Sequence, residues 1–175
     1  MALRKLHKKA LVALLLPFCV LFFVLIWAQF ETSAPAISRS IWSNTDPAIN
    51  VTHIFEGEIN RRGKPVGFHV PPPENGYPQS RVKEILSGPN RSGVTTAIVE
   101  IFDAREKRWK DKFSSLFPKK LSRQEIINAI LKAASRSELG RGEKWRGKSG
   151  YGFYIEGYRY DDGAINTAYP LYVED

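Results

Sequence analysis

Hydrophobic and polar residues follow one another along the chain in a way that predicts three strands. Residues 95–102 are apolar and β-branched, which is typical of a buried strand. Residues 151–160 and 164–173 predict two more strands, and the Asp-Asp-Gly sequence between them predicts a hairpin turn. A smaller hairpin-like return is expected over residues 53–70, where two short apolar stretches flank a basic turn.

One helix is expected, over about residues 122–138. Ser122 and Glu125 form a capping box, which satisfies backbone amides at a helix start, and an apolar face follows at helical spacing. Residues 107–120 are basic and aromatic, and residues 140–150 are rich in glycine and cations, so both segments are expected to be irregular. These elements predict an α+β fold with antiparallel sheets and one main amphipathic helix.

A long apolar run marks the N-terminus. Residues 10–30 form a run without charged residues that is long enough to span a bilayer. Four cations precede this run. By the positive-inside rule this pattern predicts a signal-anchor with the rest of the chain outside the cytoplasm, and a cleaved signal peptide is the alternative. Residues 1–30 are therefore expected to be the anchor or signal, 31–50 a linker, and 51–175 one membrane-anchored or secreted domain.

Composition and charge narrow the class of protein. The chain has 175 residues, of which 43% are hydrophobic and 25% charged, as in ordinary folded proteins. Its net charge is +8, and setting aside the four N-terminal cations leaves +4. That excess is compatible with a polyanionic partner such as nucleic acid. The single cysteine, Cys19, lies in the apolar run, so the domain is expected to lack disulfides, a thiol nucleophile and a Cys-ligated zinc.

Histidine is scarce, which makes each one informative. Apart from His7, the chain has only His53 and His69. Two imidazoles facing one phosphodiester can act as general base and general acid, and RNA supplies its own 2′-hydroxyl nucleophile. Taken alone, either histidine favours a structural role as a hydrogen-bonded polar residue. A metal site with Glu56 or Glu58 is another alternative, but no His-Glu-x-x-His pattern is present, so no metal or cofactor is expected.

Four short motifs occur in a fixed order along the expected domain. They are His53-x-x-Glu-Gly-Glu-Ile, Gly-Phe-His69, Trp109-x-x-Lys112 followed by Ser-Ser-Leu-Phe-Pro, and Thr167-Ala-Tyr169-Pro. Together they resemble the bacterial EndoU ribonucleases, a family that includes toxin domains of contact-dependent inhibition and other polymorphic toxin systems. The resemblance covers about residues 51–173, and the two histidines lie sixteen positions apart.

The resemblance implies a metal-independent RNA endonuclease with phosphorus–oxygen lyase chemistry. The 2′-hydroxyl would attack the adjacent phosphorus and leave a 2′,3′-cyclic phosphate and a 5′-hydroxyl. By analogy His69 would be the general base and His53 the general acid, with the reverse assignment left open. Lys112, with Lys110 as its competitor, would neutralise charge on the phosphoryl oxygens. Tyr169 completes the implied catalytic set.

The expected substrate-binding residues are Thr167, Ser115 and Lys110. Thr167 and Tyr169 alternate on one expected strand, so both face the same side, and the resemblance implies substrate contact and base stacking there. The implied partners are a single-stranded or tRNA-like RNA, the membrane through the N-terminal segment, and an immunity protein if the chain is a toxin. A catalytically inactive EndoU-like module that binds RNA or protein is the main alternative, and a structural membrane-anchored domain is another.

Overall fold

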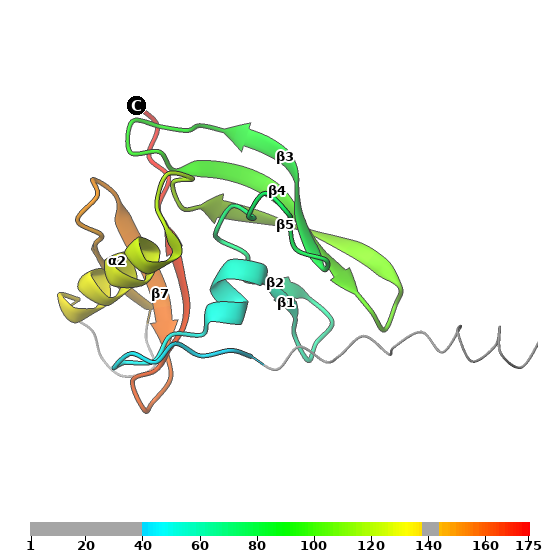
Figure 1. Cartoon of the computed structure of the whole chain (residues 1–175), viewed down its shortest axis with the longest axis horizontal. Helices are drawn as coiled ribbons and strands as arrows, with labels where there is room; N and C mark the ends of the chain where they lie inside the picture. The colour runs from blue at the N-terminus through cyan, green and yellow to red at the C-terminus, as the bar shows by residue number, and fades with distance from the viewer. Residues whose placement is uncertain (1–39, 138–143) are drawn as a thin grey trace, which may run out of the picture. The chain divides into compact units, whose positions relative to one another are not determined.

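Two three-stranded antiparallel sheets and one α-helix are the main elements of the part of the chain that the computed structural model describes, residues 40–137 and 144–175 (Figure 1). This arrangement confirms the α+β class with antiparallel sheets. The expected N-terminal segment, residues 1–30, lies outside the described residues. Within the two described ranges, none of the helices has the length and apolar character needed to cross a bilayer.

The strand order is β3-β4-β5 in the first sheet and β6-β7-β8 in the second, and β1 and β2 form a small separate hairpin. That hairpin confirms the return expected within residues 53–70. The bounds of the elements are η1 Thr52–Glu56 (a π-helical turn), β1 Glu58–Ile59, β2 Pro65–Val66, β3 Ser80–Ser87, β4 Thr95–Asp103, β5 Arg108–Leu116, α2 Arg123–Ser135, β6 Lys144–Lys148, β7 Tyr154–Arg159 and β8 Ile165–Pro170.

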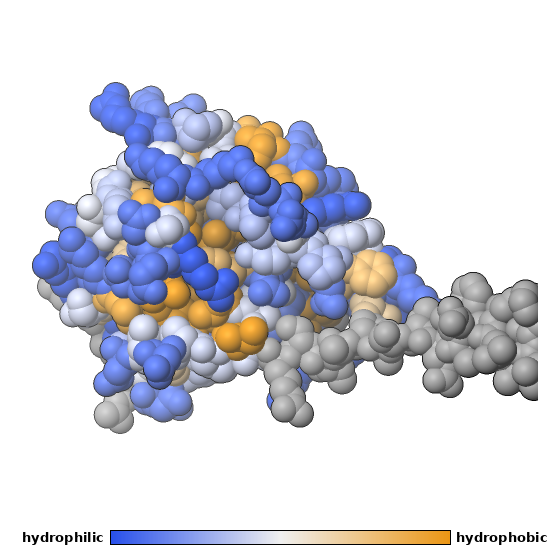
Figure 2. Space-filling view, in the orientation of Figure 1, coloured by the Kyte–Doolittle hydropathy of each residue, from blue (hydrophilic) through white to orange (hydrophobic). Residues whose placement is uncertain are grey.

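The helix α2 starts where the sequence predicts and ends at Ser135. The Ser122 hydroxyl accepts a hydrogen bond from the Glu125 backbone N–H, and the Glu125 carboxylate accepts one from the Ser122 N–H, which confirms the capping box. The apolar face of α2 packs with Trp145 and Ile155 of the second sheet in the larger of the two hydrophobic cores. Figure 2 shows hydrophilic residues over much of the outside of α2 and hydrophobic surface between α2 and the first sheet.

The first sheet contains one strand that the sequence predicts and two that it does not. The strand expected over residues 95–102 is β4. The irregular structure expected for residues 107–120 was wrong, because β5 pairs with β4 over nine residue pairs. Both β5 and the unpredicted β3 are edge strands with much of their length exposed, so backbone pairing rather than an apolar pattern holds them.

In the second sheet, β7 and β8 form the expected hairpin. The loop expected for residues 140–150 was wrong over Lys144–Lys148, because this segment is β6 and pairs with β7. Along β6, Trp145 and Gly147 are buried, while the cations that alternate with them, Lys144, Arg146 and Lys148, are exposed. The cations that suggest a loop are therefore the solvent face of a strand, since side chains alternate between its two sides.

The folded body begins before Val51, where its start was expected. Ile49 is fully buried and forms a parallel bridge with Ile165 of β8. The Asn50 N–H donates to the Ile165 carbonyl oxygen at 2.9 Å. Part of the segment expected to be a linker thus belongs to the core, because Ile49 is buried beside β8.

Candidate functional site

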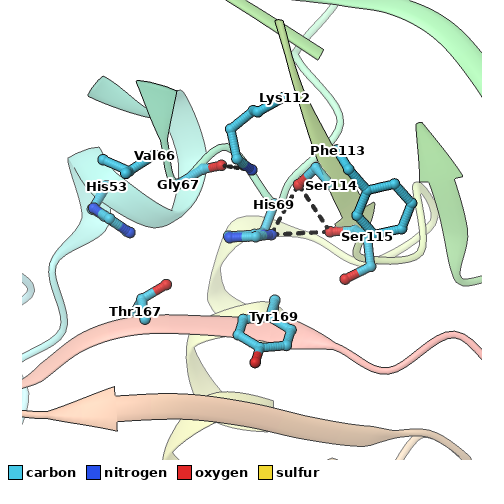
Figure 3. A pocket seen from close by; sticks show the side chains of 10 residues that line it. All are labelled: His53, Val66, Gly67, His69, Lys112, Phe113, Ser114, Ser115, Thr167 and Tyr169. Atoms are coloured by element: carbon cyan, nitrogen blue, oxygen red, sulfur yellow. Dashed lines mark hydrogen bonds between the residues drawn. The ribbon is translucent and has the colours of Figure 1, made fainter. Parts of the chain in front are cut away.

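A pocket of about 420 Å³ is lined by residues from η1, β2, β5 and β8 and from residues 67–69, which directly follow β2. Figure 3 shows the side chains that surround it. They are His53, Val66, Gly67, His69, Lys112, Phe113, Ser114, Ser115, Thr167 and Tyr169. Six of the site residues expected from the sequence therefore meet in one place, and Lys110 is the exception.

Two contacts fix His53. Its backbone N–H donates to Asn50 Oδ1 at 3.1 Å, and its ring Nδ1 lies 2.9 Å from Glu58 Oε1. Because an ionised carboxylate only accepts hydrogen bonds, Nδ1 carries a proton and Nε2 is the nitrogen left for the pocket. His53 lies just before the small hairpin rather than in one of its strands: the chain closes a π-helical turn over Thr52–Glu56, which Gly57 ends at a φ of +72°.

Backbone hydrogen bonds join the segments that carry the two histidines. The Phe68 N–H donates to the His53 carbonyl oxygen at 2.9 Å, and the His69 N–H donates to the Ile54 carbonyl oxygen at 2.7 Å. Gly67 allows this close approach, because a Cβ there would lie 1.9 Å from the His53 oxygen and its φ is +74°. The Gly-Phe-His motif therefore brings both imidazoles to the same pocket.

The His69 ring is anchored through Nδ1. This nitrogen lies 3.1 Å from the Ser115 carbonyl oxygen and 2.9 Å from Ser114 Oγ. The Ser114 hydroxyl donates to the Phe68 carbonyl oxygen at 2.7 Å, so both neighbours of Nδ1 act as acceptors. Neutral His69 therefore has its proton on Nδ1 and an unprotonated Nε2, which points towards the His53 side of the pocket in Figure 3.

The surroundings of His69 also determine its charge. Burial is the largest cause that holds the pKa of His69 well below its usual 6.5, and the Lys112 cation is the second. The hydrogen bond to the Ser115 carbonyl acts in the opposite direction, and the charge of His53 adds a smaller lowering. The ring is therefore neutral at neutral pH and able to accept a proton.

The two candidate lysines of β5 lie in different environments. Lys112 Nζ donates to the Gly67 carbonyl oxygen at 2.7 Å at the pocket wall, and burial lowers its pKa to about 8. Lys110 lies outside the pocket lining, 2.7 Å from Asp103 and 2.6 Å from Glu106, and hydrogen bonds to these carboxylates raise its pKa. Of the two, Lys112 is the one placed to meet a group bound in the pocket.

Thr167 and Tyr169 line the pocket from β8, as their alternation predicts. The Tyr169 ring packs against His69 with 5.3 Å between ring centroids. Its hydroxyl donates to Glu156 at 3.1 Å, and Glu156 is also paired with Lys144. Burial raises the pKa of Tyr169. The hydroxyl points away from His69 in Figure 3, so the ring rather than the O–H faces the pocket.

The motifs did not reveal the roles of several residues that contact these side chains. Ser114 accepts from His69, and Phe113 lies at the pocket with 60% of its surface exposed. Glu156 lies opposite Tyr169 in the register of β7 and β8. Only the register of that hairpin could have indicated Glu156, and the turn of η1 decides that Glu58 is the carboxylate that meets His53 Nδ1.

The pocket offers groups for proton transfer and anion binding. It combines two imidazoles, one ammonium and three hydroxyls from Ser114, Ser115 and Thr167. In residues 40–137 and 144–175, no three His, Cys, Asp or Glu side chains gather closely enough to hold a metal ion. A base, an acid and a fixed cation around one cavity can catalyse displacement at a phosphodiester.

Comparisons with known proteins found one family and one similar protein. The family model described as bacterial EndoU nuclease matches residues 48–172, which include the whole pocket lining. A Bacillus cereus protein named "Toxin" is 36% identical over 120 residues, which are 67% of this chain and 21% of that protein. The chain thus spans about a fifth of that relative's length. No solved structure matches the chain.

Proposed function

The chain belongs to the bacterial EndoU nuclease family, and we propose that it is an endoribonuclease that cleaves RNA by internal transesterification. The 2′-hydroxyl oxygen forms a bond to the adjacent phosphorus while the bond from phosphorus to the 5′-oxygen breaks. A base takes the 2′-hydroxyl proton, and an acid gives a proton to the 5′-oxygen. The products are a 2′,3′-cyclic phosphate and a free 5′-hydroxyl.

The observation that carries this proposal is the difference between the two histidines of one pocket. His69 has two acceptors at Nδ1 and a pKa lowered by burial, so its Nε2 is suited to take the 2′-hydroxyl proton. His53 has the Glu58 carboxylate at Nδ1, which pairs with the ring when both nitrogens are protonated. We therefore assign His69 as the general base and His53 as the general acid.

The other pocket residues act on the substrate from fixed positions. The Lys112 ammonium neutralises charge that builds on the phosphoryl oxygens, where a preorganised cation stabilises the transition state. The Tyr169 ring stacks on a base, and the Thr167 and Ser115 hydroxyls supply hydrogen bonds to base or sugar. Gly67 and Glu156 hold Lys112 and Tyr169 through the hydrogen bonds described above.

Cleavage of a mixed RNA by the full chain, kept in a mild detergent, tests the proposal. We expect His69→Ala and His53→Ala each to lower the rate by roughly a factor of 10² to 10⁴. Lys112→Gln should also lower it strongly, whereas Lys110→Gln, which removes the same charge from the same strand outside the pocket, should leave it near the parental rate. Thermal unfolding of each variant shows whether it is folded.

Product ends and metal dependence give separate readouts. We expect cyclic phosphate and 5′-hydroxyl ends, and a rate that does not change when a chelator is added. Undiminished cleavage by His69→Ala would refute the assignment. A parent chain that binds RNA and never cleaves it would instead be an inactive EndoU-like binding module.

We further propose that the nuclease is a toxin that acts outside the cytoplasm of its producer. The similarity to the protein named "Toxin" and the charge-free run at residues 10–30 behind four cations support this proposal. We expect the chain to stay with membranes after an alkaline wash and to be digested by protease added from outside. Deletion of residues 1–30 should abolish both the retention on membranes and the digestion by external protease. An immunity protein, if present, should suppress the cleavage of RNA when mixed with the chain.

A further inference from the structure

The solvent-facing side of the second sheet carries a pattern of side chains that the pocket does not use. Along β6 and β7, residues such as Trp145 and Ile155 are buried in the core, and the residues between them point outward. The outward side chains are three cations, two tyrosines and one carboxylate, which we call the open face: Lys144, Arg146, Lys148, Tyr154, Tyr158 and Glu156.

The open face continues directly from the pocket. The register of β7 and β8 pairs Tyr158 with Thr167 and Glu156 with Tyr169, so these pocket residues share a side of the sheet with the open face. Residues paired across antiparallel strands have Cβ atoms about 5 Å apart, and three strands span about 10 Å. A strand of RNA bound by Thr167 and Tyr169 can therefore run onto the open face within the length of one nucleotide or two.

The two tyrosines of the open face are exposed. Tyr154 has 38% and Tyr158 has 45% of its surface accessible, and they lie four residues apart on β7, about 13 Å along the strand. The Arg146 guanidinium lies 4.7 Å from the centroid of the Tyr154 ring. Exposed rings flanked by cations are the arrangement on which single-stranded nucleic acids stack their bases and place their phosphates.

The charges of the open face favour a polyanion. Among the described residues, no carboxylate lies within ion-pairing distance of Arg146 or Lys148. The one acid of the open face, Glu156, is bound to Lys144 and to the Tyr169 hydroxyl. The outer two cations therefore remain available to phosphate, while the acid is engaged next to the pocket.

We infer that the open face is a second RNA-binding subsite, on which bases that flank the cleavage site stack on Tyr154 and Tyr158 while Arg146 and Lys148 contact phosphates. This inference rests on the proposed function and makes it more specific. The substrate is a single strand that extends beyond the cleaved bond, because bases held in a duplex cannot leave their stack to reach the tyrosines.

Binding of an uncleavable 2′-O-methyl oligonucleotide of about twelve residues to the full chain tests the subsite without depending on catalysis. Tyr154→Thr with Tyr158→Thr should weaken binding at least about fivefold and leave its salt dependence unchanged. Arg146→Gln with Lys148→Gln should lower the slope of log affinity against log salt by roughly 1.4, or 0.7 for each lost phosphate contact on a single strand. Arg105→Gln with Lys120→Gln removes the same charge elsewhere and should leave both quantities near the parental values.

A second readout compares substrates of different length. In both open-face variants, kcat/KM for the long RNA should fall relative to kcat/KM for a dinucleotide, and the control variant should keep the parental ratio. Parental affinity, salt slope and ratio in the open-face variants would overturn the subsite and leave this surface to a protein partner. If the parent cleaves no RNA while binding shows the expected losses, the subsite stands and the proposed chemistry fails.

Discussion

At the scale of single residues, His69 is where burial and hydrogen bonding combine to fix a protonation state. Burial and the Lys112 cation together hold its pKa well below 6.5. In an NMR titration of the full chain, we therefore expect the His69 ring to stay neutral until the pH is well below 6.5. This behaviour would leave kcat/KM for RNA near its maximum at pH values where an ordinary histidine base is already protonated.

The variant Lys112→Gln separates the two causes. Removing the cation should raise the His69 pKa, but the pKa should remain below 6.5 because burial is the larger cause and stays in place. A His69 that titrates at or above 6.5 in the parent chain would contradict both the burial argument and the assignment of the base.

The lowered pKa of Lys112 predicts that the protein loses affinity for its substrate in alkaline solution. Its pKa is lowered to about 8, so the ammonium that meets the phosphate is lost in the free protein as the pH rises past that value. We expect the affinity for an uncleavable oligonucleotide to decline above about pH 8. Lys112→Arg should remove the decline, because guanidinium keeps its proton there, and a decline that persists in this variant would rule out Lys112 as its source.

Tyr169 is expected to act through its ring. Its hydroxyl already donates to Glu156, and its ring packs on His69. Tyr169→Phe should therefore keep kcat/KM for RNA within a few-fold of the parent. Tyr169→Leu should lose roughly 5-fold to 100-fold, since a base stacked on an aromatic ring contributes about 1–3 kcal/mol. An equal loss of kcat/KM in both variants would show that the Tyr169 hydroxyl, and not its ring, is required for cleavage.

At the scale of elements, the sequence predicts best where the determinants are local. The helix α2 follows from a capping box and an apolar face that both lie within its own residues. The strand β4 follows from its β-branched composition. The strands β5 and β6 could not be predicted in this way, because cations alternate along them and the hydrogen bonds that hold them come from the neighbouring strand of the same hairpin rather than from an apolar pattern of their own.

The Gly-Phe-His element makes a prediction about backbone packing. A Cβ at position 67 would lie 1.9 Å from the His53 carbonyl oxygen and 3.1 Å from the His53 ring. Gly67→Ala should therefore displace His53 and abolish RNA cleavage. Gly63→Ala is the matched control, because its φ of +73° is nearly the same and the nearest atom is 3.6 Å away.

The two glycine variants share the strain of a left-handed backbone and differ only in the clash. Gly63→Ala should cost about 1–2 kcal/mol of unfolding free energy and leave cleavage intact. Gly67→Ala should cost roughly 1–3 kcal/mol more, as inserting atoms into a packed site does. Urea denaturation gives both values, and equal costs with equal activity would mean that the close approach to His53 is unimportant.

At the scale of the whole molecule, the site depends on contacts between the first and last described segments. The motifs predict which residues matter, and six of them do line one pocket. The sequence could not show that β8 packs beside η1, or that Lys110 turns to Asp103 and Glu106 instead of the pocket. The packing of β8 beside η1 joins segments far apart in the chain, so no local pattern records it, and Lys110 is held by two carboxylates of its own hairpin that the motifs do not include.

The whole chain should lose stability in two steps as the pH falls. The folded-state pKa of His69 is lowered, so the unfolded chain binds more protons below pH 6.5, and the free energy of unfolding declines as the pH falls from there towards the folded-state value. Asp103, Glu106 and Glu125 also have lowered pKa values, so the stability that they contribute is present above their usual values of 3.8 to 4.5 and is lost below them.

Urea denaturation from about pH 8 down to about pH 3 measures both steps. His69→Gln should flatten the first step and keep the second, because it removes the buried imidazole and leaves the paired carboxylates in place. Slopes are compared rather than absolute values, so a general destabilisation by the substitution does not affect the outcome. A parental slope between pH 6.5 and the carboxylate region in His69→Gln would mean that another group is responsible, and that His69 is not held neutral by the fold.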